Sequence, residues 1–162
     1  MIAVETRLFR SIRALCAGIV LLLAGCVPPP SGPVLSGPLP PSPPGTARLV
    51  FYRSLDYYAT QSMPTVYLND KPTGISENGA VFYRDVPPGV YGITVAPSLP
   101  YPNQFKSVVV KPGDVFYVQI DALPPTGGRF NINARDYGDT FIVLLRDPVS
   151  GSYATQGLRV SG

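Results

Sequence analysis

From Ala47 onward, apolar and polar residues alternate with a period of two, which is typical of half-buried β-strands. Residues 115–121 are the clearest case, because Phe116, Val118 and Ile120 share one face of the predicted strand. No segment has a convincing helical period, so the pattern predicts an all-β fold. The predicted strands are 47–53, 65–68, 80–86, 90–96, 105–110, 115–121 and 140–146, with a short strand over 129–134 and an edge strand within 153–160.

Turn residues separate these strands at intervals that suit a small antiparallel β-sandwich of immunoglobulin-like type. Asn78-Gly79 is a strong turn signal, and residues 69–72 supply further turn residues. Residues 86–89 (Val-Pro-Pro-Gly) and 110–113 (Val-Lys-Pro-Gly) repeat a Pro-Gly turn 24 positions apart. This repeat predicts type II turns in consecutive hairpins of a meander.

One detail of the strand pattern is open. Arg84 shares its parity with Phe82 and Val86, so the strand over 80–86 either contains a bulge or has a partly hydrated face. Residues 147–151 contain Asp, Pro, Ser and Gly, and they are predicted to turn the chain between the last two strands.

The first 26 residues follow a different pattern. Arg7, Arg10 and Arg13 precede an apolar run over residues 14–24, as in a secretory signal with a basic n-region and an apolar h-region. This run has 11 residues, whereas a membrane-spanning helix needs roughly 20. A transmembrane helix is therefore not expected.

The four residues that end this region resemble the bacterial lipobox: Leu23, Ala24, Gly25 and Cys26. The resemblance implies that signal peptidase II removes residues 1–25 and that Cys26 carries a diacylglyceryl thioether and a further acyl chain, such as palmitate. Two or more chains anchor a protein firmly, whereas one holds only marginally. In the alternative, a plain secretory signal, Cys26 is incidental. Val27 stands where inner-membrane retention usually needs Asp, which points to the outer membrane with the domain in the periplasm.

Residues 27–46 contain nine prolines and favour extended polyproline II geometry rather than a core. Fully extended, they would reach roughly 60 Å at about 3.1 Å per residue. We expect either a spacer that holds the domain away from the lipid or an unstructured tail. Both alternatives divide the chain into a cleaved signal (1–25), a lipidated Cys with a Pro-rich linker (26–46) and a β-sandwich domain (47–162).

The composition of the chain limits the classes of function that it can have. Removal of residues 1–25 leaves 137 residues, enough for one domain, and no cysteine that could form a disulfide. Arg7, Arg10, Arg13 and Glu5 give the signal a net charge of +2, which leaves +1 for the rest, too little to indicate nucleic-acid binding. The chain has no histidine, the commonest general base and metal ligand. No enzyme activity, cofactor or metal is therefore expected.

Residues 47–121 carry a family resemblance. They contain Val66-Tyr67-Leu68-Asn69-Asp70, then Gly74, Val86-Pro87-Pro88-Gly89-Val90-Tyr91 and Val110-Lys111-Pro112-Gly113. This arrangement is similar to the PEGA-type repeat, and closer still to Gram-negative lipoproteins of unknown function in which a strand ending in Arg, here Phe51-Tyr52-Arg53, comes first. The resemblance implies a PEGA-like β-sandwich and no catalytic residues. Asp70-Lys71 stands where Asp-Gly is usual.

Tyrosines are the leading candidate ligand contacts, because the chain has ten of them and no tryptophan. Tyr57, Tyr58 and Tyr101 occupy predicted loops, where their rings could stack on peptidoglycan or another glycan. Ordinary packing is the default interpretation of tyrosine in a β-protein.

Oxygen-bearing side chains offer two weaker hypotheses. Asn131, Asn133, Asp136 and Asp139 form a loose loop that lacks the carboxylates and terminal glutamate of an EF-hand-type calcium site. The pairs Asp136–Asp139 and Asp56–Glu77 have the residue types for acid and base in glycoside hydrolysis, but no flanking motif supports that role.

The sequence as a whole favours a membrane-anchored envelope lipoprotein with a non-catalytic β-sandwich. Its expected partners are the membrane, through the lipid, and another envelope protein, for which exposed strand edges are candidate docking sites. The alternative is a module that binds peptidoglycan or another glycan.

Overall fold

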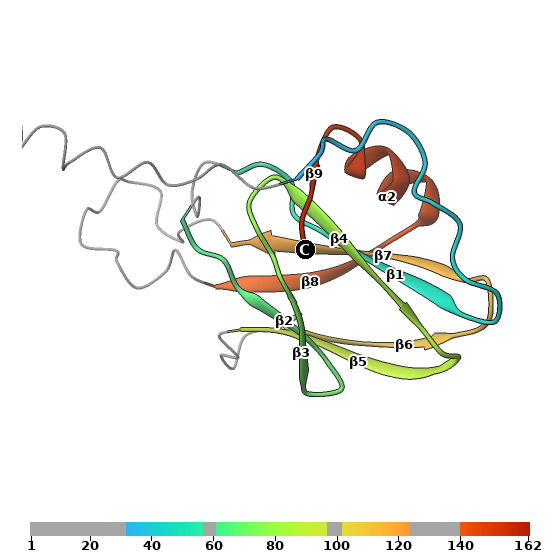
Figure 1. Ribbon diagram of the computed structural model, residues 1–162. Helices are drawn as coiled ribbons and strands as arrows, with labels where there is room; N and C mark the ends of the chain where they lie inside the picture. Colours follow the sequence, from blue (N-terminus) through green and yellow to red (C-terminus); the bar gives the residue numbers. More distant parts are fainter. Residues whose placement is uncertain (1–31, 57–60, 97–101, 124–139) are drawn as a thin grey trace, which may run out of the picture.

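The computed structural model describes residues 32–56, 61–96, 102–123 and 140–162, which form two β-sheets packed face to face (Figure 1). The chain is an all-β sandwich, as predicted, and most of its strand pairs are antiparallel. One sheet has the order β8-β7-β1-β4-β9, with β8 (Phe141–Arg146), β7 (Val115–Ala122), β1 (Ala47–Tyr52), β4 (Ala80–Val86) and β9 (Arg159–Val160). The other has the order β3-β2-β5-β6, with β3 (Lys71–Ile75), β2 (Thr65–Leu68), β5 (Gly89–Val95) and β6 (Phe105–Val110).

The inner faces of the two sheets enclose the main apolar core. Phe51 of β1 and Phe82 of β4 stack at its centre, with ring centroids 4.9 Å apart. Val118 and Ile120 are buried in this core and Phe116 packs against it, which confirms the predicted inward face of β7. Burial of each such side chain stabilises the fold by about 1.5–3 kcal/mol.

Arg84 resolves the open detail of the strand pattern. The pairing of β4 with β1 is continuous from Val81 to Val86, so the strand contains no bulge there. The Arg84 guanidinium lies over the Phe82 ring, 5.1 Å from its centroid, and its Nε donates to the carbonyl oxygen of Thr73 at 2.9 Å. The side chain is half-buried, so the inner face of β4 is partly hydrated at this point.

The two Pro-Gly turns connect different sheets, and the predicted meander of hairpins is wrong at both. β4 and β7 belong to the five-stranded sheet, whereas β5 and β6 belong to the four-stranded sheet. Gly113 has the positive φ of a type II turn (84°), but Gly89 does not and instead begins β5. Apolar alternation has the same period whether a strand folds back beside its neighbour or crosses the core, so it did not distinguish the two.

The hairpin from β2 to β3 is tighter than predicted. Asn69 and Asp70, with φ of 48° and 62°, form its two-residue turn, and Lys71 already belongs to β3. Positive φ at both positions is typical of a type I′ hairpin turn. Of the four predicted turn residues, the first two therefore form the turn, and the last two begin the edge strand β3.

A short helix, α2 (Pro148–Thr155), replaces the predicted turn at 147–151 and the first three residues of the predicted edge strand over 153–160. The Asp147 side chain caps it by accepting a hydrogen bond from the Ser150 N–H at 2.9 Å, and Pro148 occupies the first turn. The helix is short and has no amphipathic period. Gly151 and Ala154 are the residues through which it packs on the sheet. The remaining strand, β9, has two residues and pairs in parallel with β4.

Residues 32–42, which we call the strap, lie along the outer face of the five-stranded sheet rather than apart from the domain (Figure 1). Leu35 and Leu39 pack against an apolar cluster that includes Val50 and Tyr117. The described domain therefore includes residues that precede the predicted boundary at Ala47. Extended proline-rich backbone can pack on an apolar sheet face when leucines are interspersed, and these leucines were the available signal.

Candidate interaction surfaces

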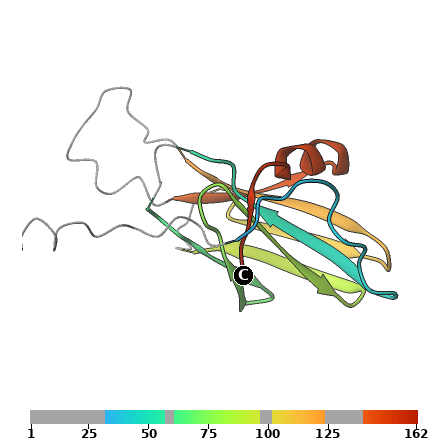
Figure 2. The same cartoon turned by 45° about the horizontal axis from the view of Figure 1, so that its top comes forward.

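The outer faces of the two sheets differ in how they are covered. The outer face of the five-stranded sheet carries Val50, Tyr52, Val81 and Tyr117, and all four are buried beneath the strap and α2. Figure 2 shows these two segments on the same side of the sandwich. This covered face is a second, smaller core.

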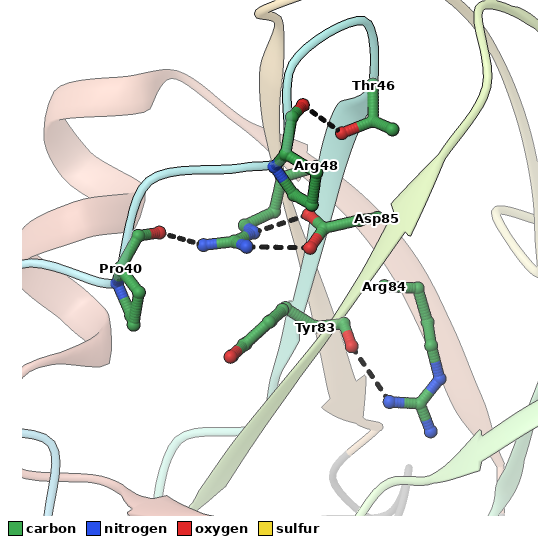
Figure 3. A network of polar contacts seen from close by, with 7 residues as sticks. Pro40, Thr46, Arg48, Tyr83, Arg84 and Asp85 are labelled. Atoms are coloured by element: carbon green, nitrogen blue, oxygen red, sulfur yellow. Dashed lines mark hydrogen bonds and ion pairs between the residues drawn. The ribbon is translucent and has the colours of Figure 1, made fainter.

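Arg48 holds the strap to this covered face. Its side chain is only 4% exposed, and its guanidinium forms a bidentate ion pair with Asp85 of β4, with Nε–Oδ1 and Nη2–Oδ2 distances of 2.7 Å (Figure 3). The remaining nitrogen, Nη1, donates to the carbonyl oxygen of Pro40 in the strap. The guanidinium also lies 4.1 Å from the centroid of the Tyr83 ring. One side chain therefore joins β1, β4 and the strap.

The charges of this pair reinforce one another. The Arg48 guanidinium holds the pKa of the Asp85 carboxyl below its usual value, and Asp85 raises the pKa of Arg48. Burial raises the pKa of the neighbouring Tyr117 phenol, which keeps that group neutral. A cavity of about 220 Å³ lies between the strap, Tyr117 and α2. The residues that line this cavity come from the strap, from the neighbouring strands β1 and β7, and from α2 with the residue that follows it.

The four-stranded sheet has an uncovered outer face. Val90 of β5 and Val109 of β6 are direct register partners and are 62% and 64% exposed. Phe105, at the start of β6, is 60% exposed and leans over Gly92. Tyr67 of β2 lies on the same face, because its neighbours Val66 and Leu68 point into the core. We call Tyr67, Val90, Phe105 and Val109 the bare face.

The two edges of this sheet differ as well. β3 contains Pro72 and a register shift opposite Val66 and Tyr67, features that discourage pairing with another strand. β6 has no proline, and Lys106 is its single charged residue, with Nζ donating to Asn103 Oδ1 at 2.9 Å. Among the described residues, no strand pairs with the outer edge of β6. An apolar face and an open edge therefore adjoin along this strand.

Most of the predicted site residues lie outside the described residues. This applies to the lipobox residues Leu23, Ala24, Gly25 and Cys26, to the candidate ligand contacts Tyr57, Tyr58 and Tyr101, and to Asn131, Asn133, Asp136 and Asp139. Their proposed roles stay predictions.

Asp56, a candidate acid or base, lies within the described part of the chain and is held by a buried arginine. Arg53 Nε and Nη2 donate to Asp56 Oδ2 at 2.9 and 2.7 Å, and Nη1 donates to the Ser62 carbonyl at 2.6 Å. The Arg53 guanidinium lies 4.8 Å from the centroid of the Phe141 ring. The arginine that ends the first strand thus fixes the start of the following loop.

Two features are absent from the described part of the chain. No three His, Cys, Asp or Glu side chains in this part of the chain gather in a way that could hold a metal ion. No described helix has the length and apolar character needed to cross a bilayer.

Sequence reasoning missed the bare face. The signal was present in β6 (FKSVVV), where apolar residues occupy both parities, so at least one of them had to face outward.

No model of a known protein family matches the chain, and no curated protein matches it either. The resemblance to PEGA-type lipoproteins therefore stays a prediction.

Proposed function

We propose that this chain is a lipoprotein of the bacterial envelope, anchored through lipid on Cys26, whose non-catalytic β-sandwich binds another envelope protein through the bare face. The lipobox-like sequence before Cys26 supports the anchor, and Val27 supports the outer membrane. The domain lies on the periplasmic side in this proposal.

The observation that carries the interaction role is the contrast between the two outer sheet faces. The chain uses its own strap and helix to cover the apolar residues of one face, yet leaves Val90, Phe105 and Val109 exposed on the other. Exposed apolar side chains that adjoin on one surface are typical of interaction sites. Lys106 at the open edge discourages unselective strand pairing, so contact through the face is favoured over simple edge addition.

The anchor is tested by the mass of the mature protein purified from membranes. We expect cleavage before Cys26 and the added mass of a diacylglyceryl group and a third acyl chain. Replacement by Cys26→Ala should abolish both the added mass and membrane retention. An unmodified Cys26 in the mature protein would refute the anchor.

The interaction role is tested by photo-crosslinking in cells. A photoreactive residue placed at Val109 should capture one dominant envelope protein, and so should one placed at Val90. The matched control is Tyr153 on α2, which is 84% exposed but lies on the opposite side of the sandwich. Equal capture from Tyr153 and Val109, or none from either position of the bare face, would count against the proposal.

A glycan-binding module is the second candidate. Register places Tyr67, Thr94 and Phe105 side by side across three strands, so two aromatic rings flank a hydroxyl on the bare face. Such rings could stack on sugar faces. If this alternative holds, the protein sediments with purified sacculi, and Phe105→Ser or the double change Tyr57→Ala, Tyr58→Ala reduces that sedimentation.

A further inference from the structure

The strap fixes where the chain leaves the folded domain toward its N-terminus. The Val160 N–H donates to the Pro33 carbonyl at 2.9 Å, and the Leu35 N–H donates to the Leu158 carbonyl at 2.7 Å. The Gln156 side chain bonds both the N–H and the carbonyl of Gly37, at 2.9 and 3.1 Å. The chain is therefore held from about residue 33 onward.

This attachment shortens the tether. Only six peptide units separate Cys26 from Gly32, and at full extension they reach about 20 Å. A free linker over residues 27–46 would reach roughly 60 Å. If Cys26 is lipidated, as the proposed function requires, Gly32 can lie no further than about 20 Å from the lipid surface.

The surroundings of Gly32 form one corner of the sandwich. Arg159 is exposed, its Nη1 donates to the Gly32 carbonyl at 3.3 Å, and its N–H donates to the Gly79 carbonyl at 3.1 Å. Leu55, which is 61% exposed, lies beside Gly79. We call Gly32, Leu55, Gly79 and Arg159 the anchor corner. It combines an exposed leucine with a cation, a combination that suits the boundary between lipid headgroups and acyl chains.

We propose that the anchor corner rests against the lipid headgroups of the membrane that holds the protein, so that the domain sits directly on the bilayer. The opposite end of the sandwich then points away from the membrane. That end carries the turn around Gly113, whose N–H donates to the Thr46 carbonyl, and β1 separates the two ends by about 20 Å.

Energy transfer from the domain to the lipid tests this orientation in the full lipoprotein. Because the sulfur of a lipidated Cys26 is blocked, one added cysteine carries the donor dye. Ser54→Cys labels the anchor corner and Lys111→Cys labels the opposite end, and both positions are exposed. The labelled proteins are reconstituted in phosphatidylethanolamine–phosphatidylglycerol vesicles with a headgroup acceptor. We expect higher transfer from position 54 than from position 111.

Two further variants separate the effect of the short tether from the effect of the contact between Leu55 and lipid. Insertion of 12 Gly and Ser residues between Pro30 and Ser31 should remove most of the difference between the positions, because the tether no longer limits reach. Leu55→Glu should lower transfer from position 54 if the leucine contacts lipid. Equal transfer from positions 54 and 111 in a lipidated protein, or no effect of Leu55→Glu, would overturn this inference. An unlipidated Cys26 would overturn the proposed function, and this inference with it.

Discussion

Arg48 and Asp85 face each other across β1 and β4, and the guanidinium donates two parallel hydrogen bonds of 2.7 Å to the carboxylate. Both side chains project from the covered face, and the arginine also reaches the strap through Pro40. Bidentate geometry of this kind gives directional as well as electrostatic stabilisation. The pair therefore ties the strap to the sheet.

Removal of one partner should be costly. Asp85→Asn leaves the buried Arg48 guanidinium without its counter-charge, and we expect a loss of about 2–3 kcal/mol in the free energy of unfolding. Chemical denaturation measures this loss. The matched double variant Arg48→Met, Asp85→Leu should recover to within about 1 kcal/mol of wild type, because no unpaired charge remains. A double variant as unstable as Asp85→Asn would contradict this explanation.

Acid should weaken the fold partly through the same pair. Because the folded-state pKa of Asp85 is lowered by Arg48, its stabilisation is complete above the unfolded value near 3.8 and is lost as pH falls through the lower folded value. We therefore expect the free energy of unfolding of wild type to fall more steeply below about pH 4 than that of Asp85→Asn. Parallel pH profiles for the two proteins would show that the pair does not contribute.

Gly151 should not tolerate a side chain. A Cβ at this position would collide with Cβ and Cγ of Tyr117, which belong to the body of a buried side chain. We expect Gly151→Ala to destabilise the protein by about 3 kcal/mol, despite the higher helix propensity of alanine. Thermal unfolding checks this, with Gly89→Ala as the control, since its nearest neighbour lies 3.7 Å from the added Cβ.

Asp70 offers a stabilising change. It holds a φ of 62° in the turn between β2 and β3, a conformation that costs a non-glycine residue roughly 1 kcal/mol. Asp70→Gly creates the Asn-Gly turn that suits this hairpin, and we expect the midpoint of thermal unfolding to rise by a few degrees. Lys71→Gly, the neighbouring change on β3, should lower it. A higher unfolding midpoint for Lys71→Gly than for Asp70→Gly would show that the backbone strain does not lie at Asp70.

Alternation alone located most of the strands, because burial and period coincide at residues such as Val118 and Ile120. It could not assign strands to sheets: the turns before Gly89 and Asp114 look alike whether the chain folds back or crosses the core. The parallel pairing of β1 with β7 depends on contacts far apart in sequence, for which a local pattern holds no signal.

The helix and the strap were missed for a different reason. Each is stabilised by the sheet it covers rather than by its own sequence, as the packing of Gly151 on Tyr117 and of Leu35 in the outer cluster shows. One local signal did exist, since Asp147 before Pro148 suits a helix start. For the bare face, the exposed Val109 lies between the buried Val108 and Val110, so the local pattern does not tell which of them faces outward, and only the assembled sheet reveals which side is covered.

The bridge between Val34 and Arg159 has a consequence for the order of events in biosynthesis. These residues lie 125 positions apart, so synthesis delivers the first long before the second. Closing so long a loop is slow relative to local pairing. The strap therefore attaches to the sheet late, and its attachment completes the outermost layer of the described domain.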